Sequence, residues 1–183
     1  MKKTILKFGV ISGLLSSLMM LATVPFEDKI GFTSLGYLVG YTTIVLSFLL
    51  VFFGIRSYRD NAGGGEITFT RAFLVGISIA LITCAGYVIT WEILYFTVMH
   101  DFMDKYSAYM LAKAQASGAS AAAIQAQMLQ MKKYKELYEN PLYNAAMTFL
   151  EPFPVGLVIT LISAAILRKK PRPQISTQEP SPA

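Results

Sequence analysis

Histidine and cysteine are almost absent from this sequence, which has one residue of each type among 183. The single Cys84 cannot form an intramolecular disulfide. One histidine and one cysteine, apart in the chain, also leave too few groups for a zinc centre or for a Cys–His or Ser–His–Asp catalytic set. We therefore expect no metal, no cofactor and no enzymatic activity.

Charged residues are also scarce, at 15% of the chain, whereas soluble domains carry roughly 25%. They are missing altogether from four long stretches, at residues 8–24, 30–55, 72–91 and 152–167. A helix needs about 20 mostly apolar residues to cross the hydrocarbon of a bilayer. The sequence therefore predicts an all-α integral membrane bundle of four transmembrane helices, with spans at about residues 7–25, 31–55, 72–98 and 145–167.

The first apolar run has an alternative interpretation as a signal peptide, because Lys2, Lys3 and Lys7 precede it. Signal peptides have a shorter apolar region, about 7–15 residues, and end in a small-residue cleavage site. The run here is longer and ends in Leu21-Ala22-Thr23-Val24-Pro25, which matches such a site poorly. A retained membrane helix is the favoured interpretation.

The basic residues form short, dense clusters before the first span, between the second and third, and after the fourth. Positively charged clusters beside membrane spans stay on the cytoplasmic side. We therefore expect a multi-pass protein with both termini in the cytoplasm. Because these Lys and Arg residues lie where lipid head groups meet the helices, they predict contact with the bilayer and none with nucleic acid.

Two glycine pairs lie four residues apart, Gly9 with Gly13 in the first span and Gly36 with Gly40 in the second. Such pairs let two helix backbones approach closely. Packing within the bundle is the simpler interpretation, and dimerisation through these faces is the alternative.

The interval between the second and third spans contains Arg59, Asp60, Gly64, Gly65 and Phe69. We expect a cytoplasmic turn from about residue 56 to the third span, with free backbone geometry at the glycines and a threonine cap, at residue 68 or 70, on the next helix.

Residues 101–140 show helical apolar spacing interrupted at Ser117-Gly118, which predicts an external helical hairpin. We expect it to fold over the outer mouth of the bundle, or to meet a partner. Residues 171–183 are rich in proline and predict a disordered cytoplasmic tail.

Two carboxylates, Glu92 and Glu151, lie at the outer edges of the third and fourth spans. Tyr95 and His100 follow shortly after Glu92 in the sequence. Ionisable residues in a membrane segment are costly and often functional. One interpretation is a polar cavity that opens outward and binds a proton, a cation or an amine. The other is that both groups lie at the solvated interface or bond to tyrosine hydroxyls that hold the two helices together. The prolines directly after Glu151 predict an irregular or kinked start to the fourth span.

Two segments carry a family resemblance: Tyr58-Arg59-Asp60 with Gly64-Gly65-Glu66-Ile67-Thr68-Phe69, Ala72-Phe73 and Gly76, and later Phe149-Leu150-Glu151-Pro152-Phe153-Pro154-Val155-Gly156-Leu157. The chain resembles the bacterial domain-of-unknown-function family 4199 across roughly residues 5–170. The resemblance implies a small four-helix protein of the bacterial inner (plasma) membrane. It implies no activity, ligand or site residue.

The sequence thus predicts one transmembrane domain over residues 1–170. Our leading hypothesis is a non-enzymatic accessory or scaffold subunit that acts by helix association, as a homo-oligomer or with a membrane-protein partner. The alternative is a small carrier or binding protein for a cation or small solute, using an outward-facing site at Glu92 and Glu151.

Overall fold

A computed structural model describes residues 1–169 of the chain, and the predicted disordered tail at residues 171–183 lies outside them. The described part is all-α, as predicted. Its elements in chain order are α1 (Lys2–Thr23), the 3₁₀ turn η1 (Val24–Phe26), α2 (Glu27–Ile30), α3 (Ser34–Ala62), α4 (Phe69–Thr97), α5 (Phe102–Ala116), α6 (Ala121–Tyr138), α7 (Pro141–Leu150) and α8 (Pro152–Leu167).

Four helical segments in the described part are long and apolar enough to cross a membrane: Lys2–Phe26, Ser34–Ala62, Phe69–Thr97 and Pro141–Leu167. The prediction of a multi-pass membrane protein with four spans is confirmed. The fourth segment consists of two helices, α7 and α8, which meet at Glu151. The first apolar run forms α1, which packs against α3 and α4 as part of the bundle.

The second span is longer than the sequence predicts, because α3 continues past residue 55 to Ala62. The polar side chains of this last part bond to residues one or four positions away in the same helix. Asp60 accepts from Arg59 at 2.7 Å and lies 3.6 Å from Arg56, and the Asn61 amide donates to the Ser57 carbonyl at 2.9 Å. Apolar composition marks the part of a helix that suits hydrocarbon, and the backbone hydrogen bonds continue beyond it.

The connection between α3 and α4 is therefore a short glycine turn and not a loop that starts at residue 56. Gly64 and Gly65 have φ values of 61° and 83°, a left-handed conformation that favours glycine. The Thr68 hydroxyl accepts from the backbone N–H of Arg71 at 3.3 Å, which confirms the predicted threonine cap on the next helix. Ile67 and Lys169 exchange two backbone hydrogen bonds, so the turn is fastened to the end of α8.

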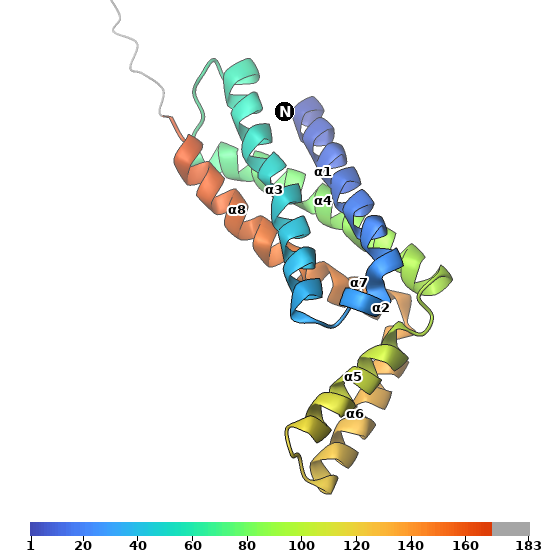
Figure 1. Cartoon of the computed structure of the whole chain (residues 1–183). Helices are drawn as coiled ribbons and strands as arrows, with labels where there is room; N and C mark the ends of the chain where they lie inside the picture. The colour runs from blue at the N-terminus through green and yellow to red at the C-terminus, as the bar shows by residue number, and fades with distance from the viewer. Residues whose placement is uncertain (170–183) are drawn as a thin grey trace, which may run out of the picture.

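Helix α4 is the central helix of the bundle and contacts α1, α3, α7 and α8. In Figure 1 it crosses behind α1 and α3 at a steep angle, with its first turns beside the end of α8. The buried core lies where these helices meet, and its largest fully buried side chains include Phe48, Ile55 and Ile79.

Helices α1 and α4 cross with their backbones almost in contact at Gly13 and Gly86. A Cβ atom on Gly86 would lie 3.2 Å from the Cα of Gly13, and one on Gly9 would lie 2.9 Å from the Cβ of Ile82. Packing of the first glycine pair within the bundle is what the structure shows. The absence of a Cβ at Gly9 and Gly86 permits this approach.

Buried hydroxyl groups accompany this close packing. The Ser12 hydroxyl donates to the Ser47 carbonyl of α3 at 2.6 Å, and Thr90 of α4 donates to the Ser17 hydroxyl of α1 at 2.7 Å. Hydroxyls that bond across helices satisfy polar groups that no water reaches in hydrocarbon. They join α1 to both of its neighbours.

The second glycine pair is placed differently from the first. A Cβ atom on Gly40 would have no atom within 4 Å, whereas one on Gly36 would meet the carbonyl oxygens of Ile30 and Gly31 in the preceding connection. Gly36 thus packs against its own connector, and Gly40 lies on an open face of α3.

The predicted hairpin is confirmed as α5 and α6, but it does not fold over the mouth of the bundle. It projects away from the membrane-spanning helices, beyond α2 and α7 (Figure 1). Its base is held by Phe32, whose ring centroid lies 5.3 Å from those of Phe102 and Tyr106 and 5.6 Å from that of Tyr109. These rings anchor the base of α5, and the hairpin projects from there.

We predict that Gly86→Leu destabilises the bundle by about 3 kcal/mol, because the new side chain would push the α1 backbone away. Ala85→Leu is the matched control, since Ala85 is exposed on the same helix. Thermal unfolding in detergent, followed by circular dichroism, measures both. Equal melting temperatures for the two variants would show that the crossing is not tightly packed.

Candidate functional site

Glu151 lies inside the fourth candidate span, at the break between α7 and α8. Pro152 opens α8 and cannot donate a backbone hydrogen bond, so the helix does not run continuously through Glu151. The predicted irregularity is therefore present. The Tyr87 hydroxyl of α4 donates to Oε2 of Glu151 at 2.8 Å. This bond ties the α7–α8 break of the fourth span to the third span.

Glu92 does not take part in this bond. It is half-buried on α4, five residues after Tyr87, which is about 140° around the helix at 3.6 residues per turn. Its Oε1 is buried and has no hydrogen-bond partner within residues 1–169. The structure thus joins Glu151 to a tyrosine, and it does not join the two glutamates by a hydrogen bond.

Tyr95 and His100 are also separated. Tyr95 is 6% exposed and packs its ring against Trp91, Phe102 and Tyr138, at centroid distances of 6.0, 6.4 and 6.2 Å. His100 is exposed in the turn between α4 and α5. Tyr95 therefore belongs to the aromatic packing that joins α4 to the hairpin.

The sequence analysis missed Asn144, which is fully buried in α7. Its Oδ1 accepts from Trp91 Nε1 at 3.0 Å and from the Thr148 hydroxyl at 3.2 Å, and its Nδ2 donates to the Tyr138 carbonyl at 3.3 Å. One amide thereby links α4, α6 and α7. An asparagine inside an apolar run is costly unless it is bonded, and that was the available signal.

The residues predicted as a cytoplasmic loop motif lie together at the opposite end of the bundle. Arg59 and Asp60 form an ion pair in the last turn of α3, Gly64 and Gly65 make the turn, and Phe69 is the first residue of α4. The Phe69 ring stacks on that of Phe73 at 6.4 Å. These contacts shape and fasten the turn.

Two titrating groups of the hairpin, outside the spans, have raised pKa values. The hydrogen bond to Asp104 raises the pKa of Lys135, which lies 2.6 Å from that carboxylate. Burial raises the pKa of Tyr138. The Asp104–Lys135 pair joins α5 to α6, and because both side chains are well exposed it contributes little to stability.

One family model matches residues 7–169, and its description is "protein of unknown function (DUF4199)". The chain belongs to the DUF4199 family. A search of curated proteins and a search of solved structures give no match. Membership agrees with the resemblance and with the four spans, and the family description assigns no activity.

In this DUF4199 chain the polar groups of the spans hold helices together. The Tyr87–Glu151 bond joins α4 to the α7–α8 break, and Asn144 joins α4, α6 and α7. Glu151 is nevertheless exposed at the surface of the bundle, so a ligand or lipid can reach this residue.

We predict that Tyr87→Phe lowers the free energy of unfolding by about 1 kcal/mol, because Glu151 loses its donor. Tyr134→Phe is the control, since Tyr134 is exposed on α6. Thermal unfolding of both variants in the same detergent tests this. A melting temperature for Tyr87→Phe equal to that of the control would mean that the bond does not stabilise the fold.

Proposed function

We propose that this DUF4199 protein is a non-enzymatic accessory or scaffold subunit of the bacterial inner membrane. It acts by helix association, and the partner is a second copy of the same protein. The proposal rests on the open face of α3. The other glycine pair is used inside the bundle, at the crossing with α4.

The open face combines a glycine with large apolar side chains. Tyr37 and Tyr41 are both 51% exposed and lie within about 100° of Gly40 around the helix. Gly40 itself has no neighbour within 4 Å of its Cβ position. Glycine inside a helix costs about 1 kcal/mol relative to alanine. A second helix that approached at Gly40 would gain close backbone contact in return.

The projecting hairpin supports the same function. It stands clear of the bundle and exposes Met128, Leu129 and Leu137. A cover for a substrate cavity would lie against the mouth of the bundle. A hairpin that extends beyond it offers a surface to another protein outside the membrane.

The basic residues support a cytoplasmic location for both termini. Lys2, Lys3 and Lys7 begin α1, Arg56 and Arg59 end α3, Arg71 begins α4, and Arg168 and Lys169 follow α8. Figure 1 shows these helix ends at one end of the bundle, with the hairpin at the other. The positive-inside rule then directs the hairpin outward.

We predict that wild-type protein in lipid nanodiscs or mild detergent gives the mass of a dimer, and that Gly40→Leu shifts it to a monomer. The leucine would fill the space that a second helix needs. Native mass spectrometry measures the masses, and Ala85→Leu, at an exposed position of α4, is the matched control. The double variant Glu92→Gln/Glu151→Gln should stay dimeric.

Two outcomes would contradict this proposal. A monomeric wild type without any bound protein would exclude helix association. A monomer that retains a small molecule, lost from the Glu92→Gln/Glu151→Gln variant, would favour the alternative of a cation or solute carrier. The exposed Glu151 carboxylate beside Tyr87 is the observation that keeps this alternative.

The orientation is tested with single cysteines in a Cys84→Ala background. We expect a membrane-impermeant maleimide to label Ser117→Cys, at the hairpin tip, in intact spheroplasts. Asn61→Cys, at the end of α3, should react only after permeabilisation. The reverse pattern would place the termini outside.

A further inference from the structure

Two adjoining cavities lie where the bundle meets the base of the hairpin. The first has a volume of about 120 Å³ and the second of about 280 Å³. Glu27 and Gly31 line both, so the two spaces adjoin at these two residues. Neither Glu27 nor these cavities take part in the helix contacts on which the proposed function rests.

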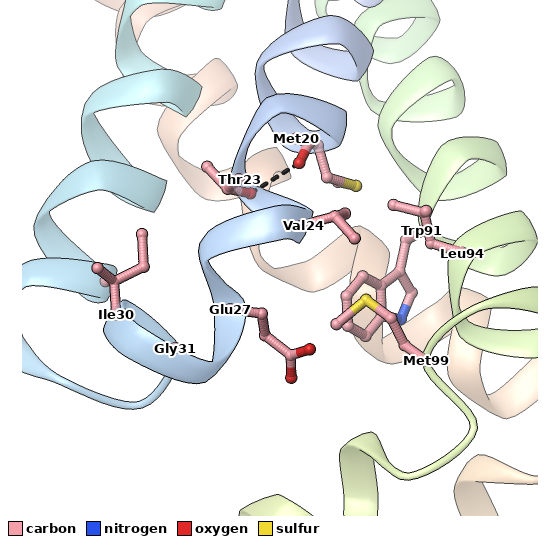
Figure 2. A pocket seen from close by; sticks show the side chains of 10 residues that line it. Met20, Thr23, Val24, Glu27, Ile30, Gly31, Trp91, Leu94 and Met99 are labelled. Carbon is pink, nitrogen blue, oxygen red and sulfur yellow. Dashed lines mark hydrogen bonds between the residues drawn. The ribbon is translucent and has the colours of Figure 1, made fainter.

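The first cavity is mostly apolar, and Thr23 and Glu27 are the polar side chains of α1 and α2 that line it. Met20 and Val24 of the first span form one wall, and Trp91, Leu94 and Met99 form the other. Figure 2 shows the Glu27 side chain pointing into the gap between α2 and the side chains of Trp91 and Met99. The Trp91 ring is held in place because its Nε1 donates to the buried Asn144 at 3.0 Å.

The second cavity adds two aromatic rings and a cation. Phe32 and Tyr109 line it, with ring centroids 5.6 Å apart, together with Lys105 of α5. Aromatic faces attract cations, and they also cover the apolar part of a ligand. Trp91, Phe32 and Tyr109 thus place aromatic surface on both sides of Glu27.

The Glu27 side chain is only 17% exposed, and its ion pair with Lys105 is long, at 3.6 Å. A charge-assisted hydrogen bond has a length of about 2.8 Å. Lys105 lies closer to Asp101, at 3.2 Å. Lys105 is therefore shared between carboxylates, and a second cation can approach Glu27 while Lys105 keeps its contact with Asp101.

We propose that the two cavities together form one cleft that binds an organic cation, namely an ammonium group with an apolar substituent. The ammonium binds the Glu27 carboxylate, and the substituent enters the space between Met20, Trp91 and Met99. A carboxylate set among apolar and aromatic walls has this specificity because an uncharged ligand would leave it with only the long contact to Lys105.

Two kinds of molecule carry such an ammonium group: a free amine in solution, and a lipid with an ethanolamine head group. The cleft lies at the end of the spans, which is where head groups are found. The experiment below separates these sources through the lipid composition of the nanodisc.

Trp91 is the single tryptophan of the chain, so its fluorescence reports on the cleft directly. We expect hexylammonium, titrated into protein in phosphatidylglycerol nanodiscs, to change the fluorescence of Trp91 with saturation. Hexanol, which has the same chain without the charge, should give no saturable change at equal concentration. This comparison uses only the wild-type protein.

Two variants test the role of Glu27 in opposite directions. Glu27→Gln should weaken hexylammonium binding at least tenfold, and Lys105→Met should tighten it several-fold by removing the competing cation. Glu136→Gln, exposed on α6, is the control and should bind as the wild type does. Melting temperatures of all variants confirm folding.

The site assignment is overturned if hexanol and hexylammonium give the same curve, or if Glu27→Gln and Lys105→Met both bind as the wild type does. Repeating the titration with phosphatidylethanolamine in the nanodisc identifies the source. Suppressed binding there, with this lipid retained in native mass spectra of the wild type and lost in Glu27→Gln, assigns the head group. Unchanged binding assigns a free amine. The mass of the oligomer is a separate readout, so failure here leaves the proposed function standing.

Discussion

The backbone contact between Gly13 and Gly86 is the constraint on which the other packing contacts depend. Lipid tails are as apolar as the side chains they surround, so membrane helices associate through close packing and hydrogen bonds more than through hydrophobic burial. At this crossing α1 lies directly on α4. That position brings Ser12 to the Ser47 carbonyl and Ser17 to Thr90. A bulkier residue at Gly86 would push the α1 backbone away and lengthen these two interhelical hydrogen bonds.

The interruption of the fourth span has a similar influence at the other end of the bundle. Pro152 prevents a continuous helix, so the segment divides into α7 and α8. The exposed end at Glu151 is joined to α4 by the Tyr87 hydroxyl. In α7, Asn144 holds the Trp91 indole, and Trp91 is also a wall of the cavity beside Glu27. The helix break, the buried amide and the proposed ligand cleft are therefore parts of one structure, connected through a single indole ring.

The two ends of the molecule differ in chemistry. One end gathers basic residues of three helices and closes with a glycine turn fastened to α8 by the Ile67–Lys169 bonds. The other end carries an aromatic cluster around Phe32, the Glu27–Lys105 pair and the projecting hairpin. Lipid head groups explain the basic end. The opposite end has the charges and cavities that a ligand or partner requires.

The sequence by itself determined the all-α class, the four spans, the hairpin and the interruption near Glu151, because apolar run length, helical spacing and proline act locally along the chain. Helix ends were less predictable: α3 continues to Ala62, since its polar last turns bond to themselves after the apolar run has ended. Only the tertiary structure decided that Gly13 meets Gly86 while Gly40 stays open, that Glu151 bonds to Tyr87 and not to Glu92, and that the hairpin projects. It alone placed Glu27 between Trp91 and Phe32. These outcomes depend on how helices rotate and cross, which residue spacing along one helix does not specify.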